Sequence, residues 1–142
     1  MSKVAVIYWS GTGNTEAMAR AVVEGVQGAG AEADLFAVHE ITAADAAKYD
    51  RLALGCPSMG DEVLEESEFE PFFQELESQI SGKTVSLFGS YGWGDGQWMR
   101  DWAERTDSAG ANLCGDGLIV NETPNADELD QCRALGKRLA MA

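Results

Sequence analysis

Two kinds of apolar pattern alternate along this chain, and their alternation limits its fold more strongly than any other feature. Runs rich in apolar and β-branched residues predict strands, and segments with apolar residues at helical spacing predict the helices between them. The strands are expected at residues 3–9, 33–38, 50–56, 83–90 and 112–120, and the helices at 15–29, 43–48, 72–80, 98–108 and 127–139. Five repeats of this order predict an α/β fold, with helices on both faces of a parallel sheet.

Several helix boundaries have local signals. Gly28 and Gly30 follow the first helical stripe and predict its end. Ser67 and Glu70 have the spacing of a capping box, which predicts the start of the third helix near Pro71. The predicted strands and helices follow one another without a linker or an internal repeat.

Length and charge narrow the class of protein. The 142 residues predict one domain spanning 1–142, and no stretch approaches the roughly 20 apolar residues of a membrane span or has the form of a secretory signal. We therefore expect a cytoplasmic protein. The net charge of −14 argues against binding to nucleic acid or anionic membranes and favours basic partners. The segment from residue 61 to residue 77 contains eight carboxylates and no Lys or Arg. It is expected to be either a solvated helix face or a docking surface.

The loops that follow the strands are where a parallel sheet of this kind binds its ligand. They are residues 9–15, 56–62, 89–97 and 121–125. The first contains SGTGNT, which lacks the lysine of a Walker A loop and has Glu16 where a dinucleotide fingerprint needs a small residue. Its amides, the hydroxyls of Ser10, Thr12 and Thr15, and the Asn14 amide suit a single phosphate dianion. An ordinary capped turn is the alternative for this loop alone.

Two further loops add a sulfur and an aromatic face. CPSMGDE, residues 56–62, places Met59 beside Gly60, and GSYGWGDG, residues 89–96, places Tyr91 and Trp93 among four glycines. Glycines let a ligand approach the backbone closely, and an indole in such a loop suits a flat partner. A flat aromatic group on a monophosphate tether fits all three loops, so FMN is the candidate cofactor.

Catalytic and metal-binding side chains are few. Cys56, Cys114 and Cys132 form no CxxC pair, so we expect free thiols, with Cys132 in the core because it lies on an apolar helical stripe. The single histidine, His39, is expected on the surface at the edge away from the predicted site. No pair of nucleophile and base is evident.

Four stretches in order resemble the flavodoxins, and in particular the short-chain flavodoxins of anaerobic bacteria. They are YWSGTGNTEAMA, GCPSMGDEVLEESEFEPFF, LFGSYGWGDGQWMRDW and LIVNETP. The resemblance implies a flavodoxin-like three-layer sandwich with a five-stranded parallel sheet of order 2-1-3-4-5. The stretch NLCGDGLIV has no room for the extra loop that long-chain flavodoxins carry in their last strand.

The resemblance also implies which residues bind FMN. Those expected at the phosphate are Ser10, Gly11, Thr12, Gly13, Asn14 and Thr15. Met59 would lie against one face of the isoalloxazine ring and Trp93 against the other. Those expected to line the ring or the ribityl chain are Ser58, Gly60, Asp61, Glu62, Ser90, Tyr91, Gly92 and Gly94, with Trp98 and Asn121 as further neighbours.

The implied function is a low-potential electron carrier, not an enzyme. Flavin would cycle between neutral semiquinone and hydroquinone, one electron at a time, in a monomer that serves redox proteins with basic docking surfaces. The Gly60–Asp61 peptide can turn its carbonyl toward the flavin nitrogen that gains a proton, and Glu62 can accept from the ring imide. The surrounding carboxylates would lower the hydroquinone potential.

Two other functions were compared with this one. A small FMN-dependent oxidoreductase such as a quinone reductase would need a substrate pocket over the flavin and usually longer loops. A phospho-acceptor receiver domain needs acidic residues after the first and third strands, where this chain has YWSG and GCPS.

Overall fold

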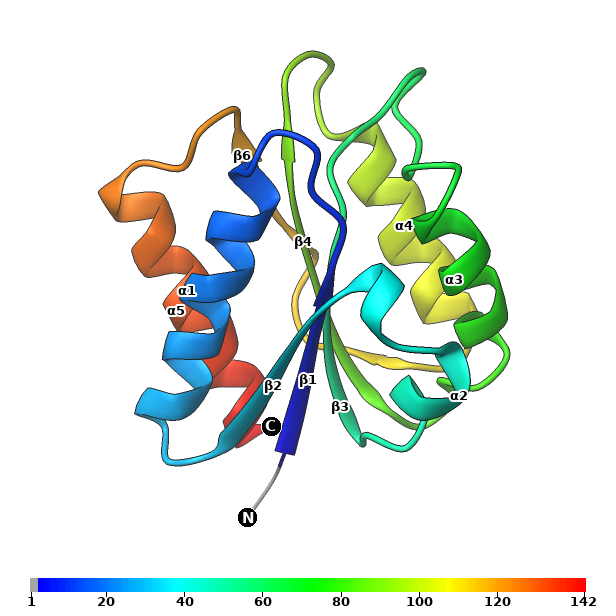
Figure 1. Ribbon diagram of the computed structural model, residues 1–142, viewed down its shortest axis with the longest axis vertical. Coiled ribbons are helices and arrows are strands. Elements are labelled where there is room, and N and C mark those ends of the chain that lie inside the picture. Colours follow the sequence, from blue (N-terminus) through cyan, green and yellow to red (C-terminus); the bar gives the residue numbers. More distant parts are fainter. Residues whose placement is uncertain (1–2) are drawn as a thin grey trace.

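The predicted parallel sheet between helical layers is present in the computed structural model, which describes residues 3–142 (Figure 1). The elements are β1 (Lys3–Tyr8), α1 (Asn14–Gly28), β2 (Glu32–Ala37), a 3-10 turn η1 (Val38–Glu40), α2 (Ala43–Ala46), β3 (Arg51–Gly55), α3 (Phe69–Glu77), β4 (Thr84–Tyr91), α4 (Gln97–Ser108), β5 (Asn112–Leu113), β6 (Leu118–Asn121) and α5 (Ala126–Met141). These strands pair in parallel in the order β2, β1, β3, β4, β5, and β6 also pairs with β4. The predicted strand order is confirmed.

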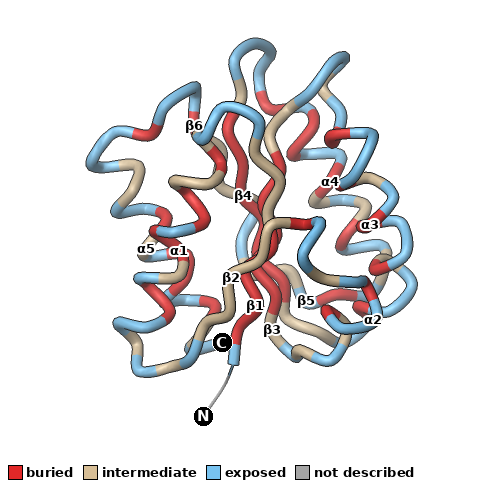
Figure 2. Tube along the Cα trace, viewed as in Figure 1, coloured by how far each residue is buried: buried red, intermediate tan, exposed pale blue. Residues whose placement is uncertain are grey.

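The helices form two layers, with α1 and α5 on one face of the sheet and α2, α3 and α4 on the other (Figure 1). Side chains alternate along β1, so that Val4 and Val6 belong to the core under α1 and α5, whereas Ala5 and Ile7 belong to the other core. Figure 2 shows the buried strands between the layers and the exposed loops at their ends. None of the described helices is long and apolar enough to cross a bilayer.

Two glycines let α1 and α5 approach closely. A Cβ atom on Gly25 would lie 1.9 Å from the Arg133 carbonyl oxygen, and one on Gly136 would lie 2.1 Å from the Val22 carbonyl oxygen. Any larger side chain at either position would push the helix backbones apart. The close contact brings the start of α1 beside the loop before α5, where Thr123 Oγ1 donates to Asn14 Oδ1 at 3.2 Å.

The prediction of one continuous fifth strand over 112–120 is wrong. The structure has two short strands, β5 and β6, which pair with opposite ends of β4. Gly115 and Gly117 between them have φ angles of 90° and 95°, in the left-handed region that favours glycine and ends a strand. A Cβ on Gly117 would also lie 2.4 Å from Met99 Sδ, so α4 packs directly against this break.

The capping box predicted from Ser67 and Glu70 is also wrong. Helix α3 begins at Phe69, and the buried carboxylate of Glu65 accepts hydrogen bonds from the backbone N–H groups of Ser67, Glu68 and Phe69, at 2.9, 2.8 and 2.9 Å, and from the Ser67 hydroxyl. The Glu70 N–H, which the Ser67 hydroxyl would bind in a capping box, donates instead to the Glu65 carbonyl oxygen at 2.8 Å.

The prediction of free thiols is confirmed, since all three cysteines are unpaired. Cys132 is buried in the core beneath α5, as its helical stripe predicted. Cys56 is also buried, and burial raises the pKa of its thiol. Neither buried thiol is therefore suited to act as a nucleophile.

Candidate functional site

Four loops meet at the carboxyl edge of the sheet, at the top of the view in Figure 1. They follow β1, β3, β4 and β6, and they are the loops that the sequence predicted as the ligand site. Between them lies a cleft of about 450 Å³. Its lining residues are Trp9, Gly11, Thr12, Asn14, Pro57, Ser58, Met59, Ser90, Tyr91, Gly92, Glu122 and Thr123.

The loop after β1 is arranged around the start of α1. The Gly13 N–H donates to Ser10 Oγ at 3.1 Å, and Gly13 has a φ of 97°, which glycine adopts readily. The Thr15 side chain is only 1% exposed, and its hydroxyl has no hydrogen-bond partner within residues 3–142. A buried hydroxyl without a partner costs about 1–3 kcal/mol, and an anion at the helix N-terminus would satisfy it. The loop therefore fits a phosphate group.

The loop after β3 is a small hairpin. The Met59 N–H donates to the Val63 carbonyl at 2.8 Å, and the Val63 N–H donates back to Met59 at 2.9 Å. Between them Gly60 and Glu62 have φ angles of 51° and 56°. Such angles are ordinary for glycine and uncommon for glutamate. Met59 and Val63 form the closing pair of this hairpin and are 37% and 41% exposed, and Met59 lines the cleft.

The Glu62 carboxylate connects this hairpin to the loop after β4. It accepts from the Gln97 N–H at 3.3 Å, and a Cβ on Gly94 would lie 2.2 Å from Glu62 Oε1. Gly94 therefore provides the space that the carboxylate occupies. The neighbouring Trp93 is 61% exposed and lies outside the cleft lining.

Buried hydrogen bonds support the loops from beneath. Trp98 is buried, donates from Nε1 to the Cys56 carbonyl at 3.1 Å, and packs against Tyr91 with ring centroids 5.6 Å apart. Ser90 Oγ donates to the Glu122 carbonyl at 2.8 Å. These contacts connect the loops after β3, β4 and β6.

The structure brings together part of the predicted set. Those that line the cleft are Gly11, Thr12, Asn14, Ser58, Met59, Ser90, Tyr91 and Gly92. Those that lie in the same loops but outside its lining are Ser10, Gly13, Thr15, Gly60, Asp61, Glu62, Trp93 and Gly94. Trp98 lies in the core, and Asn121 is exposed with Nδ2 donating to the Tyr91 carbonyl at 3.3 Å.

Four lining residues were missing from the predicted set, namely Trp9, Pro57, Glu122 and Thr123. All four lie at strand ends. Pro57 directly follows the predicted third strand, and Glu122 and Thr123 belong to the 121–125 loop that the sequence already indicated. Trp9 was assigned to the first strand, but β1 ends at Tyr8. Strand-end position alone would have identified them.

His39 is exposed, as predicted, but the prediction that it lies away from the site is wrong. It lines a hollow of about 320 Å³ together with Trp9, Ser10 and Glu68. The reason is that β1 and β2 are parallel neighbours, so the residues that follow β2 lie beside those that follow β1.

The acidic segment 61–77 is not a uniform charged face. Glu65 caps α3; burial alone would raise the pKa of its carboxyl, but hydrogen bonds from Ser67, Phe69 and Glu68 lower it below the usual value. Glu70 and Glu77 both bind the Arg105 guanidinium, at 2.6 and 2.9 Å. Exposed carboxylates remain at Asp61, Glu66, Glu68 and Glu75.

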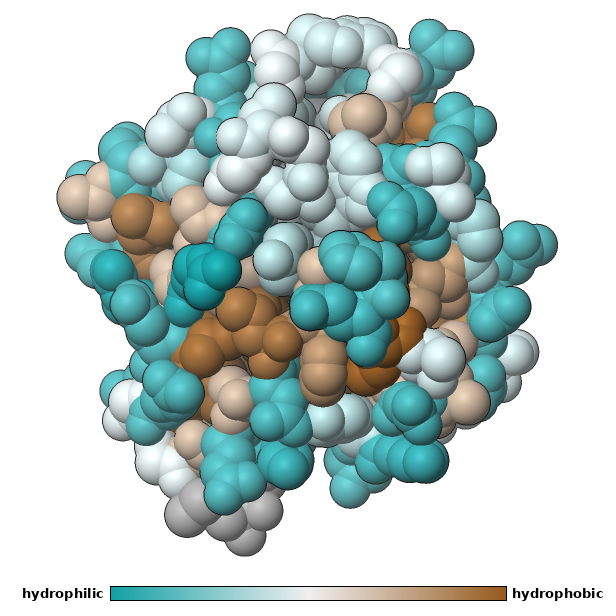
Figure 3. Space-filling model, in the orientation of Figure 1, coloured by the Kyte–Doolittle hydropathy of each residue, from teal (hydrophilic) through white to brown (hydrophobic). Residues whose placement is uncertain are grey.

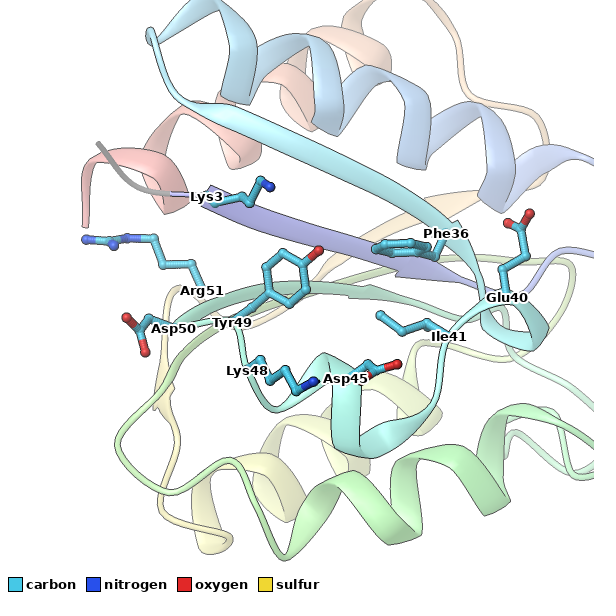
Figure 4. A pocket seen from close by; sticks show the side chains of 9 residues that line it. All are labelled: Lys3, Phe36, Glu40, Ile41, Asp45, Lys48, Tyr49, Asp50 and Arg51. Carbon is cyan, nitrogen blue, oxygen red and sulfur yellow. Dashed lines mark ion pairs between the residues drawn. The ribbon is translucent and has the colours of Figure 1, made fainter.

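A larger groove, of about 640 Å³, lies elsewhere, between β2 and α2 (Figure 4). No predicted site residue lines it. Its floor includes Phe36 and Tyr49, whose rings meet edge to face at 6.5 Å, and the Tyr49 hydroxyl donates to Asp34 Oδ2 at 2.6 Å. Lys3 pairs with Asp34 at 3.5 Å and Lys48 with Asp45 at 3.1 Å.

The same face of the molecule has apolar surface where β2 and the segment before α2 lie (Figure 3). Both lysines that line this groove are paired with carboxylates, whereas the cleft lies beside the loop that fits a phosphate group. The cleft at the carboxyl edge is therefore the better candidate site.

Comparison with known proteins agrees with this fold and site. The family model for flavodoxin matches residues 6–136. The chain is 49% identical to a flavodoxin from Clostridium beijerinckii over 135 residues, covering 95% of this chain and 97% of that protein. It is 48% identical to the flavodoxin of Megasphaera elsdenii over 139 residues, covering 98% of this chain and 99% of that one. The solution structure of the two-electron reduced Megasphaera elsdenii protein superposes with a TM-score of 0.89, covering 98% of this chain and 99% of that chain.

The chain is an α/β sandwich whose sheet has, at its carboxyl edge, a loop that fits a phosphate group and a hairpin that contributes Met59 to the cleft. This architecture is that of a flavin-binding carrier. The chain belongs to the flavodoxin family. Flavodoxins are small FMN-binding proteins that transfer electrons between redox partners and are not themselves enzymes.

Proposed function

We propose that the cleft at the carboxyl edge binds FMN, with the phosphate at the loop after β1 and the ring between the loops after β3 and β4. The unpartnered buried hydroxyl of Thr15, at the first turn of α1, is the observation that carries the assignment. When bound, FMN supplies reversible one-electron chemistry. The protein's residues bind and orient the cofactor and set the charge around it.

At the phosphate end, the donors come from the backbone and from small side chains. Thr15 donates its hydroxyl, and Ser10, Thr12 and Asn14 present polar groups around the start of α1. The structure places no lysine or arginine among the cleft-lining residues. Helix amides and hydroxyls therefore balance a monophosphate without a cationic side chain.

At the ring end, Met59 and Trp93 supply the apolar contacts on the two sides. Met59 forms the closing pair of the hairpin with Val63 and lines the cleft, and Glu62 accepts from the Gln97 N–H in a position to accept from the ring imide as well. The Gly60–Asp61 peptide lies at the turn, where glycine lets the carbonyl reorient to accept from a ring N–H.

Flavin analogues test this division of the cleft. Met59→Ala and Trp93→Ala should weaken FMN and riboflavin by the same factor, because both ligands contain the ring. Thr12→Ala should weaken FMN and leave riboflavin unchanged, because only FMN carries the phosphate. Fluorescence titration of the apoprotein measures both ligands. A ring-side variant that changes the ratio of the two affinities would contradict the assignment.

We further propose that the partners are redox proteins with basic docking surfaces. Asp61 and Glu66 are exposed, as are the apolar Met59 and Trp93, and their charges would attract a cationic partner. The same charges disfavour a second negative charge on the flavin and should keep its potential low. We propose a cytoplasmic monomer with residues 1–142 as one domain. Sedimentation at micromolar concentration tests the oligomeric state.

A further inference from the structure

A path of contacts connects the two halves of the cleft, and it begins at Trp9. The Trp9 ring lies directly against the loop after β1, since a Cβ on Gly11 would lie 3.1 Å from the ring. The same side chain lines the cleft on one side and the hollow beside His39 on the other. Its position therefore depends on the conformation of the loop after β1.

The indole of Trp9 is bound to the segment before α3. Its Nε1 donates to Glu68 Oε1 at 3.0 Å. Within residues 3–142 no other side-chain hydrogen bond joins residues 9–13 to residues 56–68. Glu68 is not part of the cleft lining, so any effect that it has on a ligand is indirect.

The path continues from Glu68 to the ring-side hairpin. The Glu68 N–H donates to Glu65 Oε1 at 2.8 Å, which fixes Glu68 at the start of α3. The Glu65 N–H donates in turn to Cys56 Sγ at 3.4 Å, and Cys56 begins the loop that leads to Met59. Contacts thus run from Gly11 to Met59, through the half-buried Trp9 and the exposed Glu68 to the buried Glu65 and Cys56.

We infer that the hydrogen bond between Trp9 and Glu68 is a latch that couples the phosphate half of the cleft to the ring half. In this account Trp9 and Glu68 are positioning residues. An anion that orders the loop after β1 fixes Trp9, and Trp9 holds Glu68 and the hairpin in the arrangement that receives the ring. The coupling is reciprocal, because each half stabilises the conformation that the other half binds. This inference rests on the proposed function, since it takes the two halves of the cleft as phosphate and ring subsites.

Riboflavin and inorganic phosphate separate the two halves experimentally. Riboflavin affinity of the apoprotein is measured with and without saturating phosphate, against sodium chloride at matched ionic strength. Phosphate should tighten riboflavin binding to the unaltered protein by about fivefold or more, the lower end of typical coupling. Trp9→Phe, which keeps an aromatic ring but has no N–H, and Glu68→Ala should each reduce this factor below about twofold, and the double variant should reduce it no further.

Two variants separate a latch from a general structural effect. Glu68→Gln keeps an oxygen that accepts from the indole, so it should retain most of the coupling that Glu68→Ala loses. Glu66→Ala removes an exposed carboxylate two residues away without breaking a described contact, so it should keep the full factor. If Trp9→Phe fails to fold, the three glutamate variants still decide the question.

The outcomes distinguish this inference from the proposed function. An unaltered protein that does not bind FMN would overturn both. A protein that binds FMN but shows no effect of phosphate on riboflavin, or one that keeps the coupling in Trp9→Phe and Glu68→Ala, would overturn the latch alone. Loss of coupling in Glu66→Ala to the same extent would also overturn it.

Discussion

Replacing Thr15 by Val should change apoprotein stability and FMN affinity in opposite directions. The two side chains have nearly the same shape, so the change removes only the hydroxyl, which is buried and has no partner within residues 3–142. In the apoprotein, removing an unsatisfied buried polar group should stabilise the fold by about 1 kcal/mol or more. In the complex, a hydrogen bond to a charged phosphate is lost, worth about 1.5–3 kcal/mol. FMN should therefore bind about 10-fold to 150-fold more weakly.

Urea unfolding of the apoprotein and fluorescence titration with FMN measure the two effects of Thr15→Val. Thr106→Val is a matched control, because the Thr106 hydroxyl is equally buried but donates to the Trp102 carbonyl at 2.7 Å, far from the cleft in α4. The control should lose about 1 kcal/mol of stability and keep its FMN affinity. If Thr15→Val binds FMN as tightly as the unaltered protein, the hydroxyl is not a phosphate donor and the reasoning fails.

Three further perturbations test other parts of the account. Gly60→Ala places a Cβ where no atom lies within 4 Å, but the φ of 51° at this position should strain the turn by about 1–2 kcal/mol. The potential for adding the first electron should therefore fall in a spectroscopic redox titration, and an unchanged potential would refute a role for the turn. Because the pKa of Glu65 lies below its usual 4.5, the stabilising effect of its carboxylate is complete above pH 4.5 and is lost as the pH falls through the lowered pKa. In urea unfolding, the unaltered protein should therefore lose stability on acidification more steeply than Glu65→Gln, and equal slopes would contradict this. Electron transfer to a basic partner should slow as salt rises, and stopped-flow rates that do not change with salt would mean that Asp61 and Glu66 do not steer docking.

The strands and the ligand-binding edge of the sheet could be predicted from sequence because buried parallel strands require runs of apolar residues. Val4 to Ile7 and Leu52 to Leu54 are buried on both faces of the sheet and therefore form continuous apolar runs. The end of each such run marks the carboxyl edge, so the loops after β1, β3, β4 and β6 could be identified before any contact was known. Strand order followed from the resemblance to flavodoxins, and not from periodicity.

The details that were mispredicted depend on contacts between distant segments. The run from 112 to 120 is apolar enough for one strand, and its break is set by Met99 packing against Gly117 from another helix. Ser67 has the right local spacing for a cap, but the Glu70 N–H donates to the Glu65 carbonyl instead, and the Glu65 N–H in turn donates to Cys56 Sγ in a distant segment. Trp98 lies in the core because α4 buries that side, which the surrounding glycines did not reveal.

The flavin that the purified protein carries is the most direct test of FMN binding in the cleft. We expect a yellow protein that releases FMN, and no FAD, on heat denaturation, as identified by chromatography against both standards. We also expect that the apoprotein regains the visible spectrum of the bound flavin when FMN is added in equimolar amount. A colourless protein whose added FMN keeps the spectrum and fluorescence of free flavin would contradict the assignment of the cleft.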